Sequence, residues 1–393
     1  MLMLRFLTAG ESHGKGLIGI VEGMPAGVYI SKEEIDMELK RRQMGYGRGG
    51  RMKIESDEVE ILSGIRWGKT LGSPIAFFIK NRDWENWKEA MNPDKAFENS
   101  HPCVTKPRPG HADLAGFIKY QHSDIRNVLE RSSARETAMR VAVGALAKQF
   151  LKIFDIKIGS FVTGIGPVCQ ELQTAYLNEK QLLELSVLSE DSPVRCPWKD
   201  TEEKFINVID QAIKNGDSVG GCFVVFATGV PVGLGSYVHW DRKLDSRIAM
   251  GIMSIQAIKA VEIGDGVIVG KKFGSEVMDE IFFDDFFYRK TNHMGGIEGG
   301  VSNGMPVIVK ATMKPIPTLR KPLKSVDVFT KEVSLASYER SDICAVPAAA
   351  VIGEAVLAWH IAEAFLEKFG GDSLQEIESN FYYYQKQIKE IKR

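Results

Sequence analysis

The sequence has almost no surplus charge: 50 lysines and arginines stand against 51 aspartates and glutamates in 393 residues. Proteins that bind nucleic acid usually carry a positive surplus, so this balance argues against a nucleic-acid partner. Any cluster of arginines in such a chain must be local. A local cluster suits a small anionic ligand better than a polymer.

Cysteine is also scarce. The five cysteines are odd in number and none stands in a C-x-x-C spacing, so we expect neither structural zinc, nor any other metal, nor disulfides. The opening "MLMLRFLTAGESHG" has too short an apolar run for a signal peptide. No uninterrupted apolar run approaches the roughly 18 residues of a membrane span. We therefore expect a cytoplasmic protein that does not associate with membranes.

A G-x-G-x-x-G motif after a strand is missing, which argues against a doubly wound nucleotide-binding sheet. The chain has an internal repeat instead. "GESHGKGLIGIVEGMPAG" from Gly10 aligns without gaps with "GDSVGGCFVVFATGVPVG" from Gly216. "VEILSGIRWGKTLGS" from Val59 aligns with "VEIGDGVIVGKKFGS" from Val261. The common order and similar spacing indicate a duplication with half-units of about 200 residues.

Both halves have the same coarse order of elements: a strand, a Gly-x-Pro-x-Gly turn, an amphipathic helix, a glycine-punctuated strand pair and a long apolar helix. The strands, strand pairs and apolar helices are expected at 16–21, 52–79 and 134–154, and again at 222–227, 260–273 and 347–369. The amphipathic helices are expected after Ser31 and at 244–259. A third, weaker pair, Arg131-Ser132 and Arg340-Ser341, precedes the two apolar helices.

This order of elements predicts an α+β fold, a β-α-β sandwich in which two antiparallel sheets enclose a central helical layer, with internal pseudo-twofold duplication. We expect one domain, 1–393, built of two interlocked half-repeats at about 1–160 and about 216–370. Two segments have no counterpart. One is a flap at about 81–110, and the other is an insertion with surface helices at about 168–215.

The segment "RSSARETAMR" at 131–140 places three arginines ahead of an apolar helix. Ser133 and Glu136 have the S-x-x-E spacing of a capping box, so a helix is expected to begin near Ala134. The N–H groups of a helix start carry about half a positive charge and, beside hydroxyls and arginines, suit a phosphate or carboxylate. An ordinary capped helix with solvated arginines explains the same residues equally well.

Three further residues allow two interpretations each. His13 in "GESHG" and His111 in "RPGHAD" lie in glycine-containing turns, where a ligand can approach closely, but lone histidines are often structural. Asp342 in "RSDICAVP" is either an acid at a site or a helix N-cap. The segment "RRQMGYGRGGR" at 41–51 is either a helix end that attracts cations or a flexible clamp for an anion.

Seven segments are similar, in order, to the successive motifs of the chorismate synthase family: "RFLTAGESHG", "RRQMGYGRGGRM", "RPGHAD", "RSSARETAMR", "MSIQAIKAVEIGDG", "NHMGGIEGG" and "ERSDICAVPAA". The resemblance implies a lyase that converts 5-enolpyruvylshikimate 3-phosphate to chorismate by 1,4-anti elimination of phosphate, the final step of the shikimate pathway. It also implies a β-α-β sandwich, a homotetramer, and dependence on reduced FMN without net redox change. Whether NADPH reduces the flavin on this chain or an external reductase does so stays open.

Carried over motif by motif, the catalytic residues of the family fall on His13, His111 and Asp342. The resemblance implies that His13 assists phosphate departure, His111 maintains the charge of the reduced flavin, and Asp342 helps to move a proton. Its FMN contacts fall on Arg131, Ser132, Ser133, Gln256, Ala257, Gly299, Lys314, Pro315, Ile316, Pro317, Thr318 and Arg340, and its nicotinamide-linked positions on Arg42 and Arg48. Its substrate contacts fall on Ser12, Arg42, Arg48, Arg108, Arg135 and Arg340. Gln256 stands where many relatives have asparagine.

Three other functions fit part of the sequence. A flavin-dependent oxidoreductase would consume NADPH in proportion to product. A nucleic-acid-binding protein, suggested by "RRQMGYGRGGR", would bind polymers in a salt-sensitive way. A non-catalytic ligand-binding protein would keep the arginines without needing His13, His111 and Asp342 together. No role is predicted for Cys344, Trp84 or Trp87.

Overall fold

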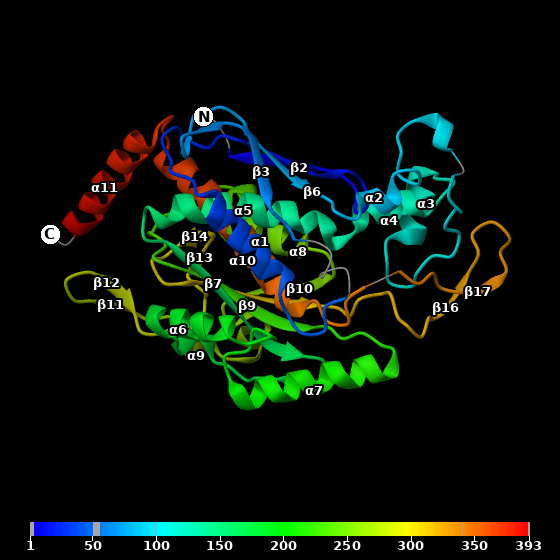
Figure 1. The fold of residues 1–393 in the computed structure, drawn as a ribbon. Helices are drawn as coiled ribbons and strands as arrows, with labels where there is room; N and C mark the ends of the chain where they lie inside the picture. The colour runs from blue at the N-terminus through cyan, green and yellow to red at the C-terminus, as the bar shows by residue number, and fades with distance from the viewer. Residues whose placement is uncertain (1–3, 50–55, 99, 340, 392–393) are drawn as a thin grey trace.

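The computed structural model describes residues 4–49, 56–98, 100–339 and 341–391, and two antiparallel sheets form its outer layers (Figure 1). The strands of the first sheet are β1 Arg5–Ala9, β2 Gly16–Glu22, β3 Val59–Ser63 and β6 Ile75–Lys80. Those of the second are β7 Lys157–Ile165, β8 Val168–Cys169, β9 Gly221–Thr228, β10 Ile258–Ile263 and β15 Val307–Met313. The strand orders are β1-β2-β6-β3 and β10-β15-β9-β7-β8.

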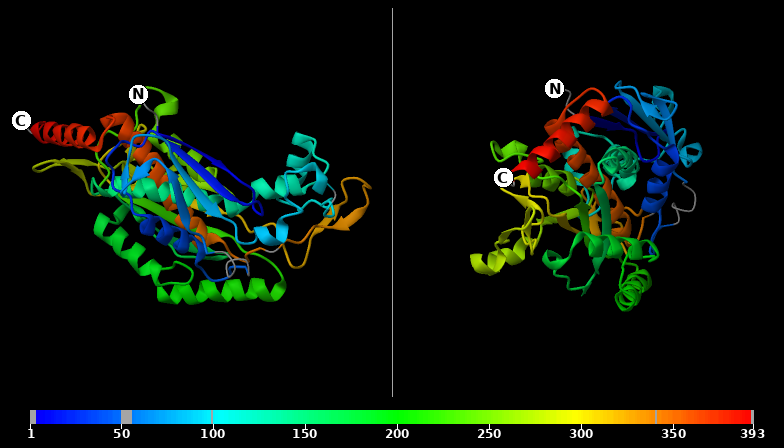
Figure 2. Two further views of the ribbon diagram at one scale, coloured as in Figure 1. Left: turned by 45° about the horizontal axis from the view of Figure 1, so that its top comes forward. Right: turned by 90° about the vertical axis from the view of Figure 1, so that its left-hand side faces the viewer.

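A layer of helices lies between the sheets, as the end-on view in Figure 2 shows. It consists of α1 Lys32–Gln43, α5 Thr137–Lys152, α8 Leu244–Met253 and α10 Val346–Phe369. Helix α5 packs on β2 and β6 of the first sheet, α10 packs on β7 and β9 of the second, and the two helices pack on each other. The predicted β-α-β sandwich is confirmed.

Most residues of both long helices are buried because other elements surround the helices. At their contact, Gly144 allows close approach: a Cβ there would lie 2.4 Å from the Cβ of Ala355. By length and composition alone α10 could cross a membrane, but 94% of its most apolar window is buried inside the protein. The apolar character of α10 is therefore explained by its place in the core.

The two sheets share one connectivity, since β1-β2-β6-β3 matches β7-β9-β15-β10 strand for strand. Helices α1 and α8 follow the second strand of each set, and α5 and α10 follow the last. The Gly-x-Pro-x-Gly turns also agree, because Gly23, Gly27, Gly229 and Gly233 all have positive φ, between 70° and 96°. A duplication predicts this arrangement. The boundaries of the half-repeats, and a twofold superposition of their strands, stay predictions.

Three local predictions are wrong. Residues 266–271 form a 3-10 turn rather than a strand, and β15 pairs with β10 in their place. Helix α8 ends at Met253, because the chain from Ile258 onward pairs with β15. The helix start expected near Ala134 is confirmed, since Ser133 caps a short 3-10 turn that begins at Ala134 and leads directly into α5 at Thr137. The third wrong prediction is the capping box. The Glu136 carboxylate pairs with Arg140 rather than closing a capping box.

Residues 81–98 and 100–132 form, together with a hairpin, a lobe at one end of the molecule (Figure 1). Its elements are α2 Trp84–Trp87, α3 Asp113–Tyr120, α4 Arg126–Ser132, β16 Lys324–Val326 and β17 Val333–Leu335. Ile125, Leu129 and Val328 form a small core within it. The predicted flap is therefore one part of a larger lobe that also includes the hairpin.

The insertion holds α6 Glu179–Glu190 and α7 Lys199–Asn215. Leu182 of α6 packs on Phe161 and Phe226, which covers the outer face of the second sheet. Smaller elements complete the fold: β4 Ile65–Arg66, β5 Lys69–Thr70, α9 Gly274–Val277, β11 Ile281–Phe283, β12 Phe287–Arg289, β13 Ile297–Glu298, β14 Val301–Ser302 and α11 Leu374–Glu390.

Candidate active site

His13 lies in the turn between β1 and β2 and is held by Glu130 of α4. The backbone N–H of His13 donates to Glu130 Oε2 at 2.8 Å, and the ring Nδ1 lies 2.9 Å from Glu130 Oε1. The ring stacks on Trp87, with 4.2 Å between the centroids. Burial alone would raise the pKa of Glu130, but the hydrogen bonds from His13 hold this pKa below its ordinary value. An ionised carboxylate therefore orients the imidazole.

The serines near His13 connect the same two segments. Ser12 Oγ lies 3.1 Å from Ser133 Oγ, and the Ser12 N–H donates to the Glu130 carbonyl at 3.0 Å. Ser132 instead donates its hydroxyl to the carbonyl of Val128 within α4. These contacts fix the turn that carries His13 against the end of α4. Arg131 adds to this, because its exposed guanidinium donates to the Thr8 and Gly10 carbonyls.

Two buried arginines share one carboxylate beside this turn. Arg135 NH1 lies 2.7 Å from both oxygens of Asp57, and Arg42 NH1 lies 3.6 Å from the same carboxylate. Arg42 also donates to Thr137 Oγ1 at 3.0 Å. Burial lowers the pKa of Arg42 to about 10, an effect that Asp57 opposes and that Arg135 and Arg48 reinforce. Two buried guanidinium groups therefore meet at one carboxylate within the described part of the chain.

Asp342 faces Arg48 rather than capping a helix. Its Oδ2 lies 2.9 Å from Arg48 NH1, and its Oδ1 accepts from the Gly49 N–H at 2.6 Å. The N-cap of α10 is Ala345, so the structure excludes the interpretation of Asp342 as an N-cap of this helix. A cavity of about 240 Å³ lies beside the pair, lined by Gly47, Arg48, Gly49, Ile213, Arg320, Tyr338, Ser341 and Ile343.

His111 has a carboxylate partner of its own. Its Nδ1 lies 2.5 Å from Asp113 Oδ1, and Arg108 Nε donates to the other oxygen of Asp113 at 2.9 Å. Burial would raise the pKa of Asp113, but His111 and Arg108 hold it well below its ordinary value. Arg108 NH1 also donates to Thr318 Oγ1 at 2.8 Å. This contact joins the His111 loop to the 314–318 run.

Residues 314–318 line the same region. Lys314 Nζ donates to the Gly110 carbonyl at 2.7 Å, and the Lys314 N–H donates to the Ala257 carbonyl at 2.9 Å. Burial lowers the pKa of Lys314, and the nearby charges of Lys259 and Arg108 lower it further. Ser218 donates to the Ile316 carbonyl at 2.6 Å.

Cross-contacts join these groups. Gln256 Nε2 donates to Glu136 Oε2 at 3.3 Å, and Glu136 accepts from Thr8, which also accepts from Arg131. Ser341 Oγ donates to the Thr318 carbonyl at 3.4 Å. The sets predicted to bind cofactor and substrate therefore adjoin one another within a single chain.

Gly299 stands apart from this group. Gly299 lies in the turn between β13 and β14, and the adjacent Gly300 accepts a hydrogen bond from Leu244 at the start of α8. Gln256 follows the other end of α8, and a ten-residue helix is about 15 Å long. Arg340 lies outside the described residues.

Several functional neighbours escaped the sequence analysis. Asp113 stands two residues after His111 in a quoted motif, so its spacing could have indicated it. Glu130 and Asp57 carry no local signal, because their partners come from distant segments. Trp87 has a ring contact with His13 and lies 4.8 Å from the Arg126 guanidinium, which gives a place to a residue that had no predicted role.

Arg42 NH1 and Gln256 Oε1 are among the buried polar atoms that lack a hydrogen-bond partner within the described parts of the chain, although Arg42 NH1 also lies 3.6 Å from Asp57. Leaving such a group unsatisfied costs about 1–3 kcal/mol, so both suit a ligand that offers an acceptor and a donor. The next residue, Ala257, has φ of 69°, a strained value for a non-glycine residue. The fold, the buried arginines and the carboxylate-held histidines together suit an enzyme that acts on a small anionic molecule.

Comparison with known proteins gives the particular family. The model of the chorismate synthase family matches residues 4–366. The chain is 56% identical over 391 residues to a chorismate synthase of Aquifex aeolicus, covering 98% of each chain. It is 56% identical over 393 residues to that of Desulforamulus reducens, covering 99% of this chain and 100% of the relative. A solved structure described as a crystal structure of chorismate synthase matches with a TM-score of 0.80 and 46% identity over 99% of both chains. The chain belongs to the chorismate synthase family of shikimate-pathway lyases.

Proposed function

We propose that the chain catalyses the 1,4-anti elimination of phosphate from 5-enolpyruvylshikimate 3-phosphate, giving chorismate. The two buried guanidinium groups of Arg42 and Arg135, which meet at Asp57, are the observation that most supports this reaction. The substrate carries a phosphate and two carboxylates, and guanidinium groups bind such groups through paired hydrogen bonds. We assign substrate binding to Ser12, Arg42, Arg48, Arg108, Arg135 and the undescribed Arg340.

Reduced FMN is the proposed cofactor. When bound, it supplies an electron-rich ring that can lend negative charge to the substrate ring and recover it. The residues that would hold it are Arg131, Ser132, Ser133, Gln256, Ala257, the undescribed Arg340 and the run Lys314–Thr318. Arg131 and Lys314 suit its phosphate, and Gln256 Oε1 suits a ring N–H. Gly299 has less support than the others, because it lies at the far end of α8. NADPH, as reductant, would approach Arg42 and Arg48.

The proton-transfer roles follow from the partners of each side chain. His13, oriented by Glu130, would protonate or stabilise the leaving phosphate. His111, oriented by Asp113, would maintain the charge balance beside the cofactor. Asp342, paired with Arg48, would help to move the proton taken from the substrate ring. The three groups lie on separate segments, so each can serve a different part of the reaction.

We also propose that the protein works as a homotetramer in the cytoplasm. The outer face of the second sheet is covered by α6, whereas the first sheet exposes apolar side chains on its strands. These are Leu7, Ile18, Ile20 and Leu62. Such a patch is typical of an interface between subunits. Size measurement by light scattering tests the assembly, and a monomer at micromolar concentration would contradict it.

An anaerobic assay with chemically reduced FMN and 5-enolpyruvylshikimate 3-phosphate tests the proposed reaction. One phosphate should be released for each chorismate formed. Omitting the flavin should abolish both. Absence of phosphate release with reduced FMN present would overturn the proposal.

A further inference from the structure

Glu130 contacts His13 at two points on one edge of the residue. One carboxylate oxygen accepts from the backbone N–H at 2.8 Å, and the two oxygens lie 2.9 and 3.1 Å from the ring Nδ1. Arg126, one turn earlier in α4, lies 3.3 Å from the same carboxylate. Its guanidinium faces the ring of Trp87, which in turn stacks on His13. The imidazole is therefore held at its edge by a carboxylate and on its face by an indole.

The Glu130 side chain is 2% exposed and ionised at neutral pH, since contacts with His13 and Arg126 overcome the effect of burial on its pKa. An ionised carboxylate only accepts hydrogen bonds, so the ring nitrogen facing it must carry a hydrogen. This places hydrogen on Nδ1 of the neutral imidazole. The atom that gains or loses a proton is then Nε2.

We propose that Glu130 is a positioning residue that keeps a hydrogen on Nδ1 of His13, while Trp87 fixes the plane of the ring. The imidazolium then gives its Nε2 proton to the leaving phosphate and is left as the Nδ1–H tautomer. The inference rests on the role proposed for His13 above. Glu130 acts through the imidazole and touches neither the reacting atoms nor the cofactor. The same carboxylate ties the His13 turn to the lobe that carries α4.

The tautomer can be observed without any reaction, by ¹⁵N NMR of the ring nitrogens in the full-length protein. The His13 signals are those lost in His13→Ala. At a pH where His13 is neutral, the wild-type ring should show a protonated Nδ1 and an unprotonated Nε2. A hydrogen on Nε2 in the wild type would overturn the proposal, and this result needs no variant at Glu130.

Glu130→Gln sharpens the test because an amide has one acceptor and one donor end. The backbone N–H of His13 needs the acceptor, so the amide NH₂ would face Nδ1 and favour the Nε2–H tautomer. We expect kcat to fall roughly 10²–10⁴-fold, as expected for a misprotonated general acid, with KM nearly unchanged. An unchanged tautomer, or an unchanged kcat, would show that Glu130 does not position His13.

Two controls separate positioning from general damage. His360 and Glu363 of α10 form the same kind of pair, with 3.0 Å between Nδ1 and Oε2, and neither is assigned to the site. Glu363→Gln should leave kcat within about twofold of wild type. In a His13→Ala background, Glu130→Gln should cause little further loss, because the group through which it acts is gone. If Glu130→Gln lowered kcat as much in the His13→Ala background as it does in the wild type, the proposal would be overturned. Full activity of His13→Ala would overturn the proposed role of His13 instead, whatever the NMR shows.

Discussion

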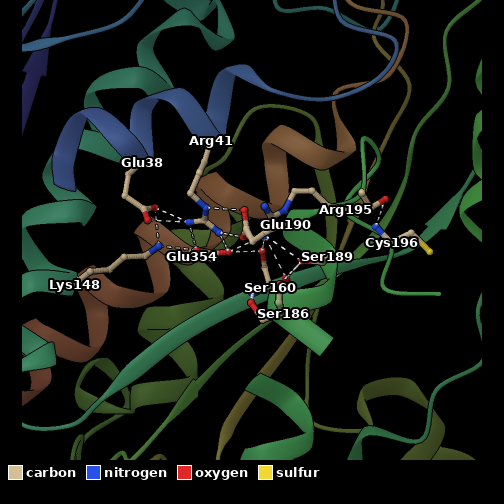
Figure 3. A network of polar contacts seen from close by, with 11 residues as sticks. Glu38, Arg41, Lys148, Ser160, Ser186, Ser189, Glu190, Arg195, Cys196 and Glu354 are labelled. Carbon is tan, nitrogen blue, oxygen red and sulfur yellow. Dashed lines mark hydrogen bonds and ion pairs between the residues drawn. The ribbon is translucent and has the colours of Figure 1, made fainter. Parts of the chain in front are cut away.

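Arg41 and Arg42 are neighbours on α1 but join two different charged regions. Arg41 enters the Glu354 network of Figure 3, which consists of Glu38, Arg41, Lys148, Glu190, Arg195 and Glu354. Arg42 enters the candidate site and shares Asp57 with Arg135. Burial alone would lower the pKa of both. Glu354 and its neighbours raise the pKa of Arg41 well above its ordinary value, whereas the pKa of Arg42 falls to about 10.

The difference distinguishes charges that hold the fold from charges that bind a ligand. In the Glu354 network, three cations meet three carboxylates, and Glu354 also accepts from Ser160 at 2.5 Å. The network links α1, α5, α6, α10 and β7, and its charges balance. At the site, among the residues that the structure describes, two guanidinium groups meet at one carboxylate and can turn further N–H groups toward an anion. Removing a charge should therefore cost stability in one region and turnover or affinity in the other.

The largest effect is expected from His13→Ala. Loss of a general acid should lower kcat roughly 10²–10⁴-fold. The affinity for FMN should stay nearly intact, because His13 is assigned to the leaving phosphate rather than to the cofactor. Steady-state phosphate release and a flavin titration measure the two effects. A variant that loses flavin binding with unchanged kcat would place His13 in the wrong role.

Glu354→Gln should instead destabilise the fold. Removing one partner of a buried ion pair typically costs about 3–5 kcal/mol, and here three cations would be left with two carboxylates, Glu38 and Glu190. Urea unfolding should show this loss, while kcat stays within about twofold of wild type. A large fall in kcat with an unchanged unfolding free energy would contradict the claim that the Glu354 network stabilises the fold rather than serving the reaction.

The same variant gives a pH test. The pKa of Glu354 is depressed in the folded protein, so its contribution is fully present above the unfolded value of about 4.3 and is lost as pH falls through the folded value. The difference in unfolding free energy between wild type and Glu354→Gln should therefore narrow below about pH 4. A difference that stays constant to low pH would contradict the assigned charge state.

Asp342→Asn keeps the shape of the side chain and removes its charge. If Asp342 helps to move the ring proton, kcat should fall about 10²-fold, the lower end for general acid–base groups. Deuterium at the transferred position should then give a larger isotope effect than in wild type. Retention of full activity would show that Asp342 only organises the loop through Gly49.

The smallest effects are expected from conservative substitutions of the two neighbours, Arg41 and Arg42. Arg42→Lys should raise KM about tenfold, because lysine cannot donate the paired hydrogen bonds of a guanidinium. Arg41→Lys should leave KM unchanged and lower the unfolding free energy by about 1 kcal/mol, the value of a typical hydrogen bond. If Arg41→Lys raised KM and Arg42→Lys lowered only the unfolding free energy, the roles assigned to the two charged regions would be reversed.

The sandwich and its two core helices could be predicted from the sequence because glycine turns and apolar periodicity are local properties. The strand that pairs with β10 could not be predicted. The expected neighbouring strand is the 3-10 turn η6 Gly266–Lys271, and β10 pairs instead with β15, which is distant in the sequence. His13 and His111 were indicated by their motifs. Glu130 and Asp57 were not, since a buried carboxylate is assigned by the cation or imidazole it meets in space, and that partner lies far away in the sequence.

The most direct test of the lyase assignment counts phosphate released per flavin oxidised in one anaerobic cuvette. The enzyme is mixed with chemically reduced FMN and excess 5-enolpyruvylshikimate 3-phosphate, and the flavin absorbance is followed together with phosphate. The account predicts many phosphates per flavin, with the flavin still reduced at the end. One phosphate per flavin, with the flavin fully oxidised, would contradict it and identify an oxidoreductase.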